Sequence, residues 1–322
     1  MKENFINQLC EKYNFTFIEF LHQNFDKDTS VSKIQNKQTK KFAILKILGP
    51  KANEDVKNAF KNEVAFYNSG ENLFAPKMFF QGNEFLIIDF FDGISLREYI
   101  HENFLKNKID EETFSTLVKE ISFTLDQFFS SGKGIFNGKQ SDAKIISDTL
   151  YDRIGNLVSS GPEFTQPSKF EQFVIRQFYK LISSKLKKNL TKIVNDWILN
   201  DLSILCDFGH YDLHSENILV GKNCKIIDYG NFKKPGFWIS DLLYFYATFF
   251  ASLSSKGNLQ QKIIDQAFIQ ICSTEKNFNK NKILDLIGLF CLAGDVNSRF
   301  RINNKGLKIF KILRFVKSVY SL

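Results

Sequence analysis

Two short motifs in the second half of the chain contain the residue types needed for metal-assisted chemistry. The first is His210-Tyr-Asp-Leu-His-Ser-Glu-Asn217, and the second is Lys225-Ile-Ile-Asp-Tyr-Gly230. Carboxylate and amide oxygens are ligands that Mg²⁺ prefers, so Asp228 and Asn217 are candidate metal ligands. Asp212 is a candidate general base, because a carboxylate beside an acceptor hydroxyl can take up its proton. Together these side chains predict transfer of a negatively charged group to a hydroxyl.

Apolar runs behind each motif indicate how these residues are positioned. Ile218-Leu-Val220 and Lys225-Ile-Ile227 are predicted as two short strands, joined by a turn at Gly221-Lys-Asn223. A hairpin of this kind would hold both candidate metal ligands on one rigid element. A single Asp before a strand is usually a cap or a turn residue, and it is the joint pattern that favours chemistry.

The chain around these motifs has two distinct patterns. The N-terminal part predicts strands over 15–20, 31–34, 41–48, 78–80 and 84–90, and an amphipathic helix over 53–68. From residue 92 the pattern is mostly helical, with a capping box at Ser95-Leu-Arg-Glu98 and an amphipathic helix over 110–130. We therefore expect an α+β, bilobal fold. Residues 1–91 form an antiparallel N-lobe sheet with one main helix, and residues 92–322 form a helical C-lobe.

Within the C-lobe, the predicted catalytic loop (206–230) is preceded by a long segment over 131–205. This segment has helical patches over 143–159, 170–190 and 190–200, interrupted by Gly161-Pro162 and by Pro167. We expect it to be a helical insertion on the substrate side of the lobe.

Composition restricts the kinds of partner. The net charge is +8 with a pI of about 9.0, but the lysines are spread along the chain, so a solvated surface is favoured and no nucleic-acid partner is expected. The five cysteines show no paired spacing. The N-terminus has no apolar signal region, and the longest apolar stretches are too short to span a bilayer. We expect a cytoplasmic protein.

The two motifs resemble those of the protein-kinase-like fold and, within it, the aminoglycoside phosphotransferase and choline kinase group of small-molecule kinases. The stretch from His210 to Asn217 is similar to that group's His-Gly-Asp-Leu-His-Pro-x-Asn, and His214 is the discriminating residue, since protein kinases usually have Lys there. The resemblance covers roughly residues 15–250 but is specific only around 206–230. It implies ATP and Mg²⁺ as cofactors and Asp212 as the catalytic base. It also implies Asn217 and Asp228 as metal ligands.

The resemblance further implies structural roles in the C-lobe. His210 and His214 would buttress the catalytic loop. Asp241, in Phe237-Trp-Ile-Ser-Asp-Leu-Leu243, matches the Asp of a later helix that braces the loop from behind.

Several N-lobe positions follow from the same resemblance. Lys46 matches the strand lysine that holds the α- and β-phosphates, and Glu63 matches the helix glutamate that pairs with it, with Glu54 as the alternative partner. A lysine in an apolar strand is costly unless it has a partner.

The hinge and the phosphate loop are less regular. Backbone groups at Asp89, Phe90 and Phe91 would bind adenine, unless these residues serve merely as the lobe linker. There is no Gly-x-Gly-x-x-Gly before the Lys46 strand, and the expected phosphate loop contains no glycine. The hydroxyls and amides of Ser30 and Ser32 are candidates to bind phosphate instead.

Two features favour a small hydroxylated acceptor, such as a sugar, an amino-alcohol or a cell-envelope glycan precursor. The segment after Asp228 is short before the next predicted helix, so it offers no platform for a peptide, and the 131–205 insertion would wall off a pocket. One alternative is a kinase acting on a protein or lipopolysaccharide acceptor. Another is a nucleotide-binding pseudokinase scaffold, which the glycine-free phosphate loop leaves open.

The C-terminal stretch 299–322 has the pattern of a basic amphipathic helix. Lys308, Lys311, Arg314 and Lys317 recur every three residues. Such a helix can make peripheral contact with an anionic membrane. The alternative is a last helix that packs on the C-lobe with its basic face in solvent.

Overall fold

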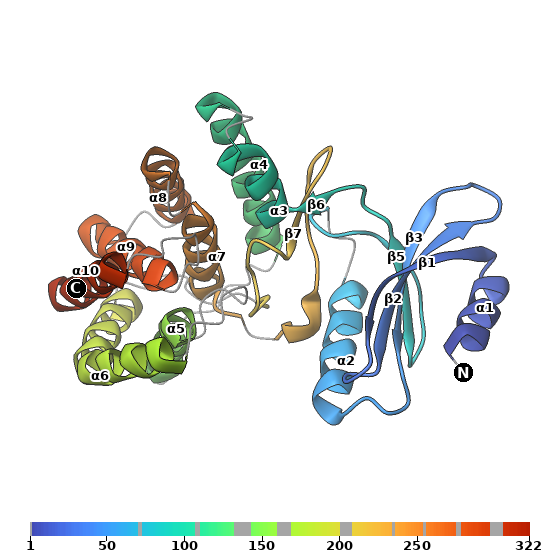
Figure 1. Ribbon diagram of the computed structural model, residues 1–322, viewed down its shortest axis with the longest axis horizontal. Coiled ribbons are helices and arrows are strands. Elements are labelled where there is room, and N and C mark those ends of the chain that lie inside the picture. Colours follow the sequence, from blue (N-terminus) through green and yellow to red (C-terminus); the bar gives the residue numbers. More distant parts are fainter. Residues whose placement is uncertain are drawn as a thin grey trace. The chain divides into compact units, whose positions relative to one another are not determined.

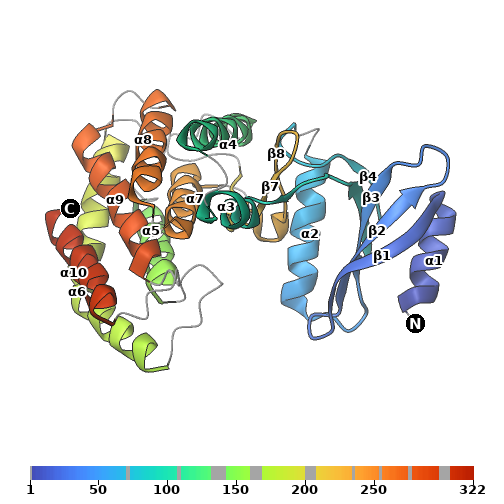
Figure 2. The ribbon, with the colours of Figure 1, turned by 45° about the horizontal axis from the view of Figure 1, so that its top comes forward.

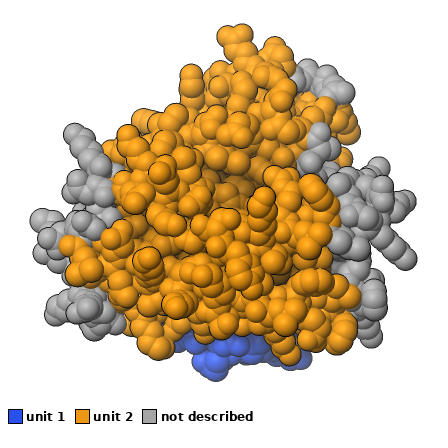
Figure 3. All heavy atoms as spheres, turned by 90° about the vertical axis from the view of Figure 1, so that its left-hand side faces the viewer, with its two compact units in different colours: residues 1–94, 219–233 blue, residues 95–218, 234–322 orange. Residues whose placement is uncertain are grey.

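The chain divides into two compact units, coloured separately in Figure 3. Unit 1 comprises residues 1–94 and 219–233, and unit 2 comprises residues 95–218 and 234–322. The hairpin and the Asp228 motif, expected in the C-lobe, are thus grouped with the N-terminal sheet. The structure is a computed structural model that describes residues 2–69, 73–106, 110–131, 143–159, 169–199, 208–233, 236–253, 256–274, 278–296 and 305–322.

Unit 1 is built on a five-stranded sheet whose strand order is β1-β2-β3-β5-β4 (Figure 1). Every neighbouring pair is antiparallel. The strands are β1 (Phe15–Asn24), β2 (Thr29–Asn36), β3 (Phe42–Leu48), β4 (Met78–Gln81) and β5 (Phe85–Asp89). All five were predicted from the sequence, with β1 and β2 longer than expected.

The two helices of unit 1 lie on opposite sides of this sheet (Figures 1 and 2). Alternate residues of β3, including Leu45 and Ile47, form a buried cluster with Ile6 and Leu9 of α1 (Lys2–Lys12). The helix α1 was not expected from the sequence. The other side carries α2 (Glu54–Asn68), the predicted main helix.

The start of α2 is set by local chemistry. Asn53 caps the helix, because its side chain accepts a hydrogen bond from the backbone N–H of Val56 at 2.9 Å. Glu54 and Asp55 in the first turn complement the positive end of the helix dipole. Further along the helix, Glu63 is buried.

The predicted hairpin is present. It consists of β7 (Ile218–Val220) and β8 (Cys224–Ile226), which form a small sheet in the order β6-β7-β8 with β6 (Ile94–Ser95). At its turn, a Cβ on Gly221 would lie 2.4 Å from the carbonyl oxygen of Asp92. Only glycine fits this approach, which places the hairpin against the segment that follows β5.

Unit 2 is helical, as predicted. Its helices are α3 (Leu96–Ile100), the π-helical turn η1 (His101–Leu105), α4 (Glu111–Ser131), α5 (Ala143–Ser159), α6 (Lys169–Leu199), α7 (Trp238–Ser252), α8 (Gly257–Thr274), α9 (Lys280–Val296) and α10 (Lys305–Ser321). The helix α7 is central, because it is buried along nearly its whole length and packs against α5, α8 and α9.

The expected insertion contains two helices that pack against each other, α5 and α6. The bounds of α5 match the first predicted patch, whereas the patches over 170–190 and 190–200 form one helix, α6. No proline or glycine lies between those two patches, so nothing in the backbone interrupts the helix. Gly161, Pro162 and Pro167 lie outside the described residues, as does the stretch 201–207.

Within the described part of the chain, none of the helices combines the length and the apolar character needed to cross a bilayer.

Candidate active site

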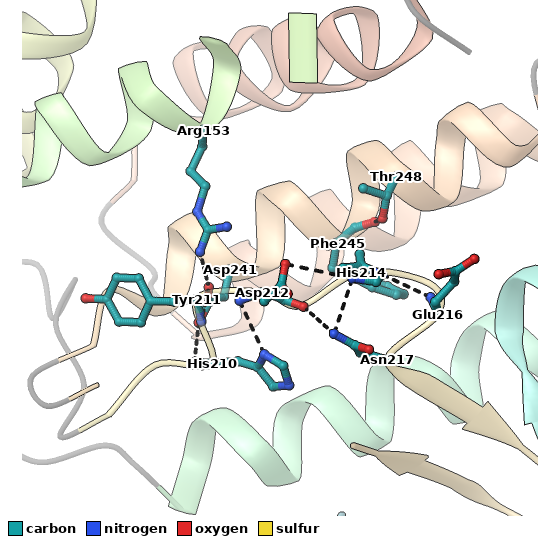
Figure 4. Close-up of polar contacts among 10 residues, drawn as sticks. All are labelled: Arg153, His210, Tyr211, Asp212, His214, Glu216, Asn217, Asp241, Phe245 and Thr248. Carbon is teal, nitrogen blue, oxygen red and sulfur yellow. Dashed lines mark hydrogen bonds and ion pairs between the residues drawn. The ribbon is translucent and has the colours of Figure 1, made fainter. Parts of the chain in front are cut away.

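The catalytic loop is held from behind by one buried carboxylate. Asp241, in the first turn of α7, accepts the backbone N–H of His210 at 2.7 Å and that of Tyr211 at 3.1 Å (Figure 4). Tyr211 has a φ of 61°, in the left-handed region that a bulky residue rarely adopts. These two hydrogen bonds compensate that strain and fix the turn leading into Asp212.

Arg153 of α5 completes this brace. Its guanidinium donates to Asp241 at 3.2 Å, and its Cζ lies 4.7 Å from the ring centroid of Tyr244 and 5.8 Å from that of Tyr211. Burial raises the pKa of Asp241, and Arg153 and the two backbone donors oppose that rise. The helical insertion is therefore joined to the catalytic loop through a buried ion pair.

The two histidines of the motif orient the loop backbone. His210 is fully buried, and its Nδ1 accepts the N–H of Asp212 at 3.3 Å. His214 does the same for Glu216, with its Nδ1 at 3.2 Å from that nitrogen. In both rings Nδ1 accepts a backbone N–H from a residue two positions further along the loop. This geometry gives both residues a supporting place in the loop.

Asn217 is tied to the residue expected to be the base. Its Nδ2 donates to the backbone carbonyl of Asp212 at 2.8 Å and lies 3.3 Å from Nε2 of His214. This contact fixes the amide plane and leaves Oδ1 as the amide atom suited to ligate a cation. The side chain of Asp212 remains 31% exposed, with Oδ1 3.8 Å from Nε2 of His214, so an incoming hydroxyl has access to it.

The far end of the loop is anchored to α3. Arg97 forms an ion pair with Glu216 at 2.5 Å, and its backbone N–H donates to the carbonyl of Ser215 at 3.2 Å. Both ends of the loop, at Asp241 and at Arg97, are thus attached to helices of unit 2.

Unit 1 contains a second group of side chains that the sequence predicted to be functional. Nζ of Lys46 on β3 lies 2.5 Å from Oε1 of Glu63 on α2, which is the pairing predicted from the sequence. Glu54, the alternative, instead pairs with Lys57 on the surface. Burial disfavours the charged ammonium, but Glu63 and then Asp228 outweigh it, and the pKa of Lys46 is raised.

The charges of this group do not cancel. Burial raises the pKa of Glu63, and the nearby carboxylate of Asp228 raises it further, against the effect of Lys46. One ammonium thus lies within electrostatic reach of two carboxylates, of which Glu63 is buried and Asp228 is exposed. An excess of negative charge of this kind is complementary to a cation.

The segment around Asp228 is held against α2. Asp228 has a φ of 63°, and the ring of the next residue, Tyr229, stacks on Phe66 with centroids 3.4 Å apart and planes at 11°. Nδ2 of Asn62 donates to the carbonyl of Gly230 at 3.0 Å. Because Phe66 and Asn62 flank Glu63 on α2, these contacts keep Asp228 near the Lys46–Glu63 pair.

The side-chain oxygens of the two predicted metal ligands, Asp228 and Asn217, are of a kind that binds Mg²⁺. The described residues contain no cluster of three or more histidine, cysteine or acidic side chains that would make an all-protein metal cage. Mg²⁺ in nucleotide sites is usually bound by one or two carboxylates together with phosphates and water. Asp228 in unit 1 and Asn217 in unit 2 each carry a side-chain oxygen of this type.

The predicted hinge begins at the end of β5. The backbone N–H of Asp89 donates to the carbonyl of Lys77 at 2.7 Å, so it is already used inside the sheet. The carbonyl of Asp89 and the backbone of Phe90 and Phe91 remain candidates to bind a base. The ring of Phe90 lies 6.0 Å from that of Phe42, and Nζ of Lys33 lies 4.5 Å from its centroid.

Ser30 and Ser32 do not lie in a phosphate loop, as their sequence context had suggested. They lie within β2, opposite Ile47 and Leu45, whereas Val31 is opposite Lys46. Since side chains alternate along a strand, both serines point to the sheet face opposite Lys46, and both hydroxyls are buried without a hydrogen-bond partner. We therefore leave them out of the nucleotide site. The sequence predicted a turn up to Ser30, but the strand begins at Thr29 and therefore includes Ser30.

Two functional contacts were missed from the sequence. Arg153 and Arg97 lie in helices remote from the motif, and neither belongs to a catalytic motif. A buried arginine on the apolar face of a predicted helix was the only available signal for Arg153.

Comparison with solved structures supports the fold predicted from the sequence. The structure is similar to that of a choline kinase from Cryptosporidium parvum Iowa II, with a TM-score of 0.50 and 13% identity over 99% of this chain and 96% of that one. It was also matched to an ethanolamine kinase from Plasmodium vivax, with a TM-score of 0.45 and 14% identity over 96% and 81%. No protein-family model and no curated protein sequence matches the chain. The chain therefore has the protein-kinase-like fold seen in choline kinase, which confirms the fold predicted from its two motifs.

Proposed function

We propose that this protein is an ATP-dependent phosphotransferase that moves the γ-phosphate to a hydroxyl of a small molecule. The observation that carries the proposal is the construction of the catalytic loop. Asp212 is presented to solvent while its backbone is fixed by His210 and by Asn217. A general base needs this combination of access and fixed position.

Unit 1 supplies the groups that would hold the nucleotide. Lys46, kept charged by Glu63, would bind the α- and β-phosphates, and the backbone at Asp89 and Phe91 would bind adenine. Asp228 and Asn217 would ligate Mg²⁺, which neutralises the charge of the phosphates when bound.

Asp212 would accept the proton of the acceptor hydroxyl as its oxygen attacks the γ-phosphorus, and the bond from that phosphorus to the bridging oxygen of ADP would break. His210, His214 and Asp241 act on this step only by holding the loop. Arg153, which lies in the helical insertion, has the same indirect role, because its guanidinium offsets the charge of Asp241.

A small acceptor is favoured over a macromolecule. The segment after the Asp228 motif reaches α7 at Trp238 without room for a long peptide platform, and α5 and α6 lie before the loop in sequence. The choline kinase of similar fold is named for a small amino-alcohol substrate. We propose an acceptor among sugars, amino-alcohols and cell-envelope glycan precursors.

The test is a transfer assay with radiolabelled ATP and Mg²⁺ against separate pools of these three classes, of proteins and of lipopolysaccharide. We expect label in a small-molecule pool, and we expect Asp212→Asn to slow transfer by about 10²- to 10⁴-fold while ATP binding is retained. Asp265→Asn, at an exposed position on α8, is the matched control and should transfer normally.

Other results would decide against the proposal. Label in protein or lipopolysaccharide alone would indicate a macromolecular acceptor. A melting temperature raised by Mg-ATP, with no label in any pool, would indicate a pseudokinase scaffold.

A further inference from the structure

Basic residues are concentrated on two neighbouring helices of unit 2. The helix α10 contains five basic residues and no acidic residue. The helix α6 contains seven basic and two acidic residues. No residue that we assign to phosphoryl transfer lies on either helix.

The helices α6 and α10 lie side by side (Figures 1 and 2). Nδ2 of Asn189 on α6 donates to the backbone carbonyl of Val319 on α10 at 2.9 Å. Lys185 and Lys192 lie about one helical turn before and after Asn189, on the same side of α6, and both are exposed. Basic groups of α6 therefore adjoin the C-terminal half of α10.

The inner face of α10 is fully occupied. Ile312, Phe315 and Val319 are buried, and Nζ of Lys311 forms an ion pair with Asp295 of α9 at 2.9 Å. The sequence pattern predicted Lys311 among the solvent-facing basic residues. That prediction is wrong, because Lys311 is largely covered and ion-paired. The ion pair and the apolar contacts fix the helix on unit 2 and determine which face remains outward.

The outward face of α10 combines large apolar side chains with cations. Phe310, Leu313 and Tyr320 are 55%, 54% and 62% exposed. Arg314 and Lys317 are exposed between them. Positions three, four and seven residues apart share one side of a helix, so these five residues form a single strip, here called the α10 strip.

The chemistry of the α10 strip matches a membrane surface. Aromatic and aliphatic side chains enter the boundary between headgroups and acyl chains, while lysine and arginine remain with anionic headgroups. A nucleic acid would pair with the cations but would leave Leu313 in water. A protein partner would have to supply both an acidic and an apolar surface, whereas a bilayer with anionic lipids offers both along its whole area.

We propose that the α10 strip and the adjoining lysines of α6 bind the surface of membranes that contain anionic phospholipids. The site is separate from the residues of phosphoryl transfer, and the proposal does not depend on their function. It gives the protein a fixed face toward a membrane.

The experiment is co-sedimentation of the full-length protein with vesicles of phosphatidylcholine alone or mixed with phosphatidylserine. We expect binding only to the mixed vesicles, and weaker binding as salt rises. Each basic residue near an anionic surface strengthens binding by about fivefold, so R314E/K317E should weaken it by at least about 25-fold. F310S/L313S should weaken binding by about tenfold or more, because it removes the inserted apolar groups.

A matched control changes the net charge by the same amount at other exposed lysines. Lys41→Glu combined with Lys119→Glu should leave vesicle binding within about twofold of wild type. The melting temperature of each variant shows that it is folded.

Three outcomes would overturn the proposal. These are equal binding to both kinds of vesicle, equal loss in the control and in R314E/K317E, and unchanged binding by F310S/L313S. The same proteins are titrated with a fluorescent single-stranded RNA. Binding of RNA without binding of vesicles would assign the strip to nucleic acid instead.

Discussion

Replacing Arg153 with Met tests the brace behind the catalytic loop. The change keeps most of the aliphatic contact but removes the guanidinium that donates to Asp241 at 3.2 Å. The two side chains are 11% and 2% exposed, so the pair is shielded from water and from salt. The carboxylate would lose its counter-charge while remaining buried.

The expected cost follows from these contacts. Removing one partner of a buried ion pair typically destabilises a protein by about 3–5 kcal/mol. Asp241 keeps its hydrogen bonds from His210 and Tyr211, so we expect the lower end, about 3 kcal/mol. Arg153→Lys keeps the charge but loses the forked donor and the contacts with the Tyr211 and Tyr244 rings. It should cost about 1 kcal/mol.

Urea unfolding of wild type, Arg153→Met, Asp241→Asn and the double variant measures the interaction between the two side chains. Because each single change leaves the other partner buried and unpaired, the double variant should be less destabilised than the sum, by about 1.5 kcal/mol.

The penalty also depends on pH in a defined direction. Burial already raises the pKa of Asp241, and loss of Arg153 removes the largest opposing influence. Protonation of Asp241 in the folded state removes the uncompensated charge. The difference between wild type and Arg153→Met should therefore shrink as the pH falls from about 7.5 to about 5.

Two results would refute this reasoning. One is a coupling energy near zero, which would mean that Arg153 stabilises only by packing. The other is a destabilisation that stays constant between about pH 7.5 and about pH 5, which would mean that Asp241 is already neutral when Arg153 is present.

Three further changes test other parts of the structure. Lys46→Met should slow phosphoryl transfer by about 10²- to 10³-fold in single-turnover assays, because the phosphates lose a fixed cation, and an unchanged rate would exclude Lys46 from the site. Asn62→Ala should cost about 1 kcal/mol in urea unfolding, because its hydrogen bond to the Gly230 carbonyl is lost. Gly236→Ala should cost about 3 kcal/mol in the same assay, because a Cβ there would lie 2.0 Å from the backbone carbonyl carbon of Phe208, and wild-type stability would show that the backbone can move apart.

The fold was largely predictable because its signals are local. Apolar, β-rich runs bounded by turn residues predicted the five strands of the sheet, and helical periodicity predicted α2, α4 and α5 close to their bounds. The hairpin of β7 and β8 followed from two apolar runs and a glycine turn. The helix α1 was missed, because most of its residues are polar and its few apolar ones span barely two turns.

The site was predictable only where chemistry is concentrated in a motif. Lys46 and Glu63 pair as expected, and Asp241 receives the loop N–H groups as expected. The roles of Asp212, Asn217 and Asp228 remain predictions.

The remaining features depend on tertiary structure. The sheet face on which Ser30 and Ser32 lie depends on the pairing register of β2, because a shift of one residue moves every side chain of a strand to the other face. The contact of Arg153 with Asp241 joins positions on separate helices and has no local signature.

The central claim is that oxygen ligands on this chain bind magnesium together with ATP. Calorimetric titration with a non-hydrolysable ATP analogue, with and without Mg²⁺, tests it most directly in wild type and in Asp228→Ala. We predict that wild type binds the analogue at least about tenfold more tightly with Mg²⁺ than without it, and that Asp228→Ala loses this difference. Equal affinity with and without Mg²⁺ in the wild-type protein would contradict the account.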